Sequence, residues 1–115
     1  MRSALIQGKL FVTWDGEVCF RNVEGLTETI NDAADKRASA IEIDMRDVTF
    51  IDSSGLQALV SARRRFPGPG GVRVLVTEGA QPDRVLRLAK LEIVLGVVSY
   101  PRSAHREAAT AAPSL

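Results

Sequence analysis

The sequence lacks most of the features that define common special classes of protein. It has one cysteine, Cys19, so an intramolecular disulfide is excluded, and no Cys and His residues have zinc-ligand spacing. Fifteen basic and fourteen acidic residues leave a formal net charge of +1, which gives no electrostatic case for direct binding of nucleic acid or a membrane. There is no signal-like leader and no apolar run of the roughly 18 residues that span a bilayer. We therefore expect a cytoplasmic protein.

The length and hydrophobic content predict one domain. A chain of 115 residues that is 45% hydrophobic can build a single core but has no room for a second. We expect this domain to occupy residues 1–101. Residues 102–115, which are rich in alanine and polar side chains, are expected to form a terminal helix that frays into a flexible tail.

Strand and helix patterns alternate along the chain. Apolar runs predict strands at 4–6, 10–14, 40–51, 72–76 and 94–99, with a turn at Asp15 and Gly16. Apolar spacing of three and four predicts helices at about 22–37, from residue 54 to the breaker cluster at 66–71, and at 82–90. The order indicates an α/β fold with a mostly parallel sheet and an antiparallel edge. Binding sites in such sheets favour the carboxyl ends of the strands.

One strand-to-helix junction carries an unusual cluster of small polar residues, Asp52-Ser53-Ser54-Gly55. Ser54 and Gln57 have the spacing of a capping box, which predicts that Ser54 caps the following helix. Ser53 then lies just outside the helix and has no evident structural role. A phosphate on Ser53 would be close to the helix amino end, which favours negative charge. From spacing alone, however, a plain helix cap is the more common explanation of such a cluster.

Residues 47–56, Asp-Val-Thr-Phe-Ile-Asp-Ser-Ser-Gly-Leu, closely resemble the signature of the STAS family of anti-sigma factor antagonists. In that family the first hydroxyl residue after the aspartate accepts a phosphate, which implies Ser53 here. Residues 14–18 and 86–98 resemble other parts of the family more loosely. The resemblance implies a single STAS-like domain, with a mixed, mostly parallel five-stranded sheet, helices packed on one side, and no catalytic centre.

The sequence departs from the family pattern at Cys19, where an aspartate near the phosphoacceptor is usual. The absence of this aspartate is expected to affect either how efficiently Ser53 is phosphorylated or which kinase phosphorylates it. Cys19 itself has two interpretations, a redox-sensitive thiol or, more commonly for a lone cysteine at a strand end, a small apolar residue.

Other candidate sites are weaker. His105, the only histidine, lies in the polar tail without a partner motif. Asp44, Asp47 and Asp52 are explained by turn and cap roles rather than by magnesium binding. The glycine-rich segment 67–71 has no Gly-Lys-Ser/Thr and precedes a strand, unlike a nucleotide-phosphate loop. We expect no cofactor and no metal.

Two functions follow from the resemblance. The first is an antagonist that, when unphosphorylated, binds an anti-sigma factor with serine kinase activity and so releases the sigma factor; a protein phosphatase would reset it. The second is a STAS scaffold or subunit in a stress-signalling or lipid-transport complex. An enzyme with Ser53 as nucleophile is disfavoured because no motif places a base beside it.

The partner is expected to dock around the motif loop and the exposed side of the following helix. Leu56, Leu59 and Val60 are predicted to form the buried stripe of this helix, which directs positions 57, 61 and 64 outward. The predicted docking residues are Asp52, Ser53, Ser54, Gln57, Ser61 and Arg64.

Overall fold

A computed structural model describes residues 1–102 and shows a five-stranded sheet in the order β1-β2-β3-β4-β5. The strands are β1 (Arg2–Ile6), β2 (Lys9–Val18), β3 (Ala40–Ile51), β4 (Val72–Thr77) and β5 (Val97–Tyr100). The helices are α1 (Val23–Asp35), α2 (Ser53–Arg65) and α3 (Gln81–Leu88). β1 is antiparallel to β2, and the other neighbouring strands are parallel. The predicted fold class is therefore confirmed.

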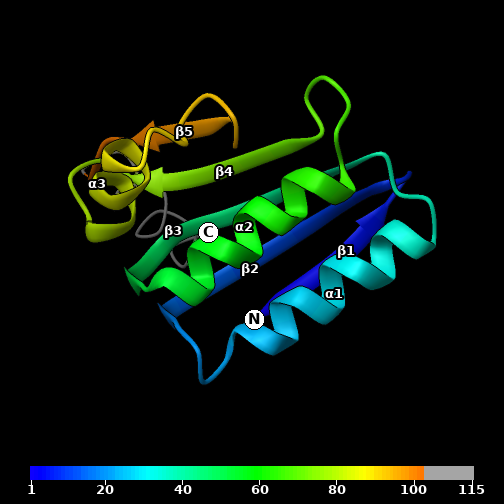
Figure 1. Cartoon of the computed structure of the whole chain (residues 1–115), viewed down its shortest axis with the longest axis horizontal. Helices are drawn as coiled ribbons and strands as arrows, with labels where there is room; N and C mark the ends of the chain where they lie inside the picture. Colours follow the sequence, from blue (N-terminus) through cyan, green and yellow to red (C-terminus); the bar gives the residue numbers. More distant parts are fainter. Residues whose placement is uncertain (103–115) are drawn as a thin grey trace, which may run out of the picture.

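The core lies between one face of the sheet and the helices. Alternation along β3 buries Ile41, Ile43 and Met45, whereas the intervening charged side chains are partly exposed on the other face. α1 and α2 lie side by side across the sheet, and α3 lies at the carboxyl end of β4 (Figure 1). Leu26, Leu59 and Leu86, one from each helix, belong to the same buried cluster. Burying a side chain of this size stabilises the fold by about 1.5–3 kcal/mol.

The predicted turn at Asp15 and Gly16 is wrong, because β2 continues through both residues to Val18. The register against β3 shifts there instead, and Gly16 adopts a φ of 78°, which a glycine tolerates without strain. The indole N–H of Trp14 donates to the Glu17 carbonyl at 3.0 Å across this irregularity. β2 therefore reaches as far as the end of β3, which brings the loop after it to the motif.

The ends of the chain differ from expectation in detail. β5 begins at Val97 rather than at residue 94, because residues 92–95 form turns that bury Leu95. The expected terminal helix and tail fall outside the described residues from 103 onward, so the boundary at 101 stays a prediction. No helix within residues 1–102 is long and apolar enough to cross a membrane.

Candidate functional site

Asp52, not Ser54, caps α2. Its backbone is extended, with φ −102° and ψ −173°, and its carbonyl accepts the first helical hydrogen bond from the Leu56 N–H at 3.0 Å. The Asp52 carboxylate accepts the Gly55 N–H at 3.0 Å. The helix consequently begins at Ser53, two residues earlier than a cap at Ser54 would place its first residue. The motif offers three consecutive residues that can cap, and spacing could not decide which backbone is extended.

The same carboxylate ties the motif to the loop between β2 and α1. One Asp52 oxygen binds Gly55, while the other accepts the Phe20 N–H at 3.0 Å. The Asp52 N–H in turn donates to the Val18 carbonyl at 3.1 Å. Hydrogen bonds from Gly55 and then from Phe20 lower the pKa of Asp52, so the group is ionised at neutral pH.

Ser53 occupies the first position of α2 and is exposed, whereas Ser54 beside it is half-buried. A phosphate on Ser53 would be held by the N–H groups at the amino end of α2. One of them, that of Gly55, is already used by Asp52. A phosphate on Ser53 would therefore share the helix amino end with a carboxylate.

Gly55 allows α2 to start directly against the sheet. A Cβ atom at this position would lie 2.5 Å from Ile51 Cγ1 and 3.0 Å from Val18 Cγ1, closer than packed carbon atoms approach. The buried glycine thus lets the first turn of the helix rest on the carboxyl ends of β2 and β3. This contact fixes where Ser53 is presented.

The outer face of α2 carries a shallow hollow of about 390 Å³, the α2 hollow. Its lining brings together the predicted docking residues Gln57, Ser61 and Arg64 with Leu56 and Val60. The sequence pattern predicts that the last two are buried; both are only partly buried, and Leu56 packs against the buried cluster. The residues that α2 buries are Gly55, Ala58, Leu59 and Ala62.

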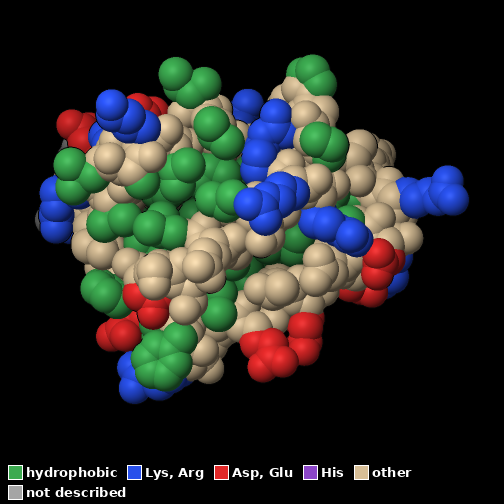
Figure 2. Space-filling view, viewed as in Figure 1, with side chains coloured by type: hydrophobic (Ala, Val, Ile, Leu, Met, Phe, Trp, Pro, Cys, Tyr) green, Lys and Arg blue, Asp and Glu red, His purple; other side chains and the backbone are tan. Residues whose placement is uncertain are grey.

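Apolar side chains gather on this side of the molecule between α2 and α3, with basic side chains at their border (Figure 2). The exposed apolar residues of the α3–β5 segment include Leu88, Ile93 and Val94. An α2 surface that combines half-exposed aliphatic groups with a cation is suited to protein contact rather than to chemistry.

Gln81 supports the end of β3, a role that the sequence did not suggest. Its side-chain oxygen accepts the Ile51 N–H at 2.9 Å, and its amide donates to the Ile51 carbonyl at 3.0 Å. β3 and β4 stop pairing after Asp44 and Leu75, so Gln81 replaces the missing strand neighbour. A glutamine thirty positions away leaves no local pattern from which this contact could be found.

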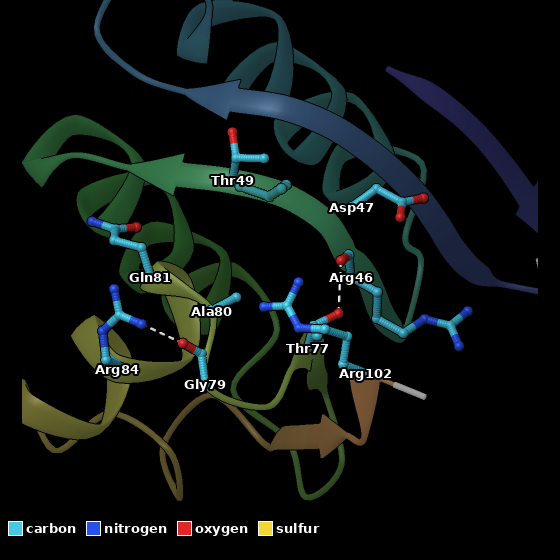
Figure 3. Close-up of a pocket in the computed structure, with 10 residues that line it drawn as sticks. Arg46, Asp47, Thr49, Thr77, Gly79, Ala80, Gln81, Arg84 and Arg102 are labelled. Carbon is cyan, nitrogen blue, oxygen red and sulfur yellow. Dashed lines mark hydrogen bonds between the residues drawn. The ribbon is translucent and has the colours of Figure 1, made fainter. Parts of the chain in front are cut away.

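Gln81 also borders a larger hollow of about 580 Å³ between the ends of β3 and β4 (Figure 3). Two of the arginines that line it are engaged within the fold. Arg46 pairs with Asp44 at 2.9 Å and lies 4.9 Å from the centre of the Tyr100 ring, and Arg84 donates to the Gly79 carbonyl. We assign these contacts a structural role.

No three His, Cys, Asp or Glu side chains in the described part of the chain lie close enough together to hold a metal ion. Asp44 and Asp52 have the pairing and capping roles described above. Cys19 is buried, with 5% of its surface exposed, which agrees with its interpretation as a small apolar residue.

Residues 3–104 match the family model of the STAS domain. The chain belongs to the STAS family. No curated protein matches the sequence significantly.

Solved structures similar to this STAS protein include an anti-sigma factor antagonist from Mycobacterium paratuberculosis, with 22% identity over 94% of this chain and 90% of the other and a TM-score of 0.71. SpoIIAA in its unphosphorylated form has 16% identity over 99% and 98% of the two chains, with a TM-score of 0.63. Bacillus SpoIIAA in its phosphorylated form has 17% identity over 94% and 97%, with a TM-score of 0.65. At these identities the likeness shows a shared fold.

Proposed function

We propose that this STAS protein is an anti-sigma factor antagonist controlled by phosphorylation of Ser53. In the unphosphorylated state it binds an anti-sigma factor with serine kinase activity and thereby releases a sigma factor in the cytoplasm. Phosphorylation of Ser53 ends the binding, and a phosphatase restores it. The observation that carries the proposal is an exposed Ser53 at the first position of α2, beside the α2 hollow, in a STAS fold.

The surroundings of Ser53 fit a substrate of a kinase better than an enzyme nucleophile. A serine nucleophile needs a base within hydrogen-bonding reach that accepts its proton. The neighbouring Asp52 carboxylate already accepts two backbone N–H groups, and these lower its pKa. Asp52 is thus a weak base, which supports a binding module without catalytic activity of its own.

The α2 hollow supplies the proposed docking surface. Of the three consecutive arginines at the end of α2, Arg63 donates to the Phe66 carbonyl and Arg65 pairs with Asp35 at 2.8 Å. Arg64 is exposed and lines the hollow. Arg64 therefore provides a cation that can meet an acidic rim on the partner.

Incubation with candidate serine-kinase anti-sigma factors and ATP, followed by mass spectrometry, tests the proposal. We expect one phosphate on Ser53, no labelling of Ser53→Ala, and normal labelling of Ser54→Ala. A phosphate on Ser54 or Thr49 would contradict the assignment. Tight binding without any phosphorylation would favour a scaffold role instead.

A charge reversal tests the docking surface independently of the phosphate. Arg64→Glu should weaken association with the kinase that phosphorylates Ser53 about tenfold, because one cation at an interface edge is replaced by an anion. Arg73→Glu, at an exposed position on β4, is the control and should leave association unchanged. Equal affinities for the two variants would place the partner elsewhere.

A further inference from the structure

Phe20 is the most exposed aromatic side chain among the described residues. Of the four phenylalanines, Phe66 is buried and Phe11 is half-buried, whereas 72% of Phe20 and 43% of Phe50 are exposed. Single exposed apolar residues are common and need no explanation by themselves. Both exposed phenylalanines, however, adjoin the Ser53 motif: Phe50 precedes it on β3, and Phe20 is hydrogen-bonded to its aspartate.

The backbone around Phe20 is held firmly although its ring lies in solvent. The Cys19 N–H donates to the Asn22 side-chain oxygen at 2.9 Å, and the Asn22 amide donates to the Glu17 carbonyl at 2.8 Å. The Phe20 N–H donates to Asp52 at 3.0 Å. An apolar side chain presented on a fixed backbone loses little conformational entropy on binding, which is the property of an interface anchor.

The neighbouring Arg21 specifies the kind of pocket that would receive this ring. Its guanidinium lies 5.9 Å from the centre of the Phe20 ring and 3.7 Å from the Glu17 carboxylate, and both charged side chains are more than half exposed. A complementary surface would be an apolar pocket for the ring with an acidic group at its edge for Arg21.

The place of Phe20 relative to Ser53 connects it to the docking surface. The loop between β2 and α1 lies beside the amino end of α2 (Figure 1), and Asp52 bonds to both elements. Ser53 therefore lies between the Phe20 loop on one side and the α2 hollow on the other. A partner that covers both would place Ser53 in the desolvated centre of the interface, where a phosphate is most disruptive.

We propose that Phe20 inserts into an apolar, acid-edged pocket of the same kinase that phosphorylates Ser53, and that Asp52 acts as the positioning residue that holds Phe20 in place. This inference rests on the proposed function. It adds a second contact area, on a different element from the α2 hollow, and assigns the second hydrogen bond of Asp52 a role in recognition.

The first test measures, by calorimetric titration without ATP, the affinity of variants of this protein for the kinase that phosphorylates Ser53. Phe20→Ala should bind at least tenfold more weakly, as anchor truncations do. Phe20→Gln, which keeps much of the length but not the apolar ring, should be weakened similarly. Ile6→Ala removes an apolar side chain that is 55% exposed on the edge strand β1 and should bind within about twofold of wild type.

The second test separates positioning from capping. Asp52→Asn retains a side-chain oxygen for the Gly55 N–H and keeps a good helix cap, but the amide nitrogen that it introduces cannot accept the Phe20 N–H. Asp52→Asn should therefore bind several-fold more weakly with nearly unchanged thermal stability. In the Phe20→Ala background the same substitution should add no further loss, because its effect acts through Phe20.

The outcomes distinguish the inference from the function on which it rests. Normal labelling of Ser53 together with wild-type affinity of Phe20→Ala would overturn the anchor and leave the proposed function standing. Fully additive losses for Asp52→Asn and Phe20→Ala would overturn the positioning role. Absence of Ser53 labelling and of binding by the wild-type protein would overturn the proposed function itself, and the inference with it.

Discussion

At both the β3–α2 and the β4–α3 junction a carboxylate binds backbone N–H groups, yet only the first junction presents an exposed serine. At the first, Asp52 precedes the helix and accepts the N–H groups of Gly55 and Phe20. At the second, Asp83 lies inside the first turn of α3 and accepts the Gly79 N–H at 2.9 Å. Asp83 is only 5% exposed and also binds Arg87 and Ser99, each at 2.8 Å.

The two junctions differ in exposure: the first leaves a serine hydroxyl open to solvent, whereas the second is closed by contacts within the fold. The contacts of Asp83 join α3 to β5, and both of its carboxylate oxygens accept hydrogen bonds from other parts of the fold. The contacts of Asp52 leave Ser53 facing solvent. In sequence, both junctions are short segments, 52–55 and 78–83, that contain glycine and aspartate and follow an apolar strand.

The largest expected effect concerns the packing that only the first junction needs. Gly55→Ala should lower the free energy of unfolding by about 3 kcal/mol, because the new methyl group meets Ile51 at 2.5 Å in a filled core. Gly25→Ala is the matched control in α1, where nothing lies within 4 Å, and should stabilise by up to about 1 kcal/mol. Urea denaturation measures both, and equal effects would contradict the close packing of α2.

The next largest effect is expected when the carboxylate of either junction is removed. Asp83→Ala should cost about 2 kcal/mol, because it leaves the Gly79 N–H and Arg87 without an acceptor in a mostly buried place. Asp52→Ala should cost less, since its hydrogen bond to Phe20 is exposed and its hydrogen bond to Gly55 is only partly buried. Ser54→Ala should change stability by less than about 0.5 kcal/mol, because Ser54 is not the cap. Thermal unfolding that ranked Ser54→Ala above Asp52→Ala would restore the capping-box interpretation.

The smallest effect is in the pH dependence of stability. Burial alone would raise the pKa of Asp83, but hydrogen bonds from Gly79, Ser99 and Arg87 outweigh it and lower the pKa. A lowered folded pKa gives stability that is present above the unfolded value of about 3.9 and is lost as the pH falls through the folded value. Unfolding free energies measured from pH 6 to 3 should therefore fall less steeply for Asp83→Asn than for wild type. Parallel curves would contradict the role of these bonds.

The fold could be predicted from sequence because it depends on local patterns. The alternation at 40–45 and the helical spacing around Leu26 and Leu59 report directly which side is buried. The motif at 52–55 likewise marks its junction without any knowledge of the rest of the chain.

The features that could not be predicted depend on contacts between residues that are far apart in the sequence. Asp52 with Phe20, and Gln81 with Ile51, are separated by about thirty positions and have no periodicity. Which residue caps α2 is decided by which backbone is extended. Asp52, Ser53 and Ser54 could all adopt that conformation, so the sequence could not identify the cap. At Asp15 and Gly16, pairing with β3 outweighed turn propensity.

Calorimetry with the fully phosphorylated and the unphosphorylated protein, each titrated into the same anti-sigma factor, tests most directly whether Ser53 controls docking. The unphosphorylated protein should bind, and the form phosphorylated on Ser53 should bind at least a hundredfold more weakly while its circular dichroism spectrum and melting temperature stay close to those of the unphosphorylated form. Equal affinity of the two forms would contradict the account.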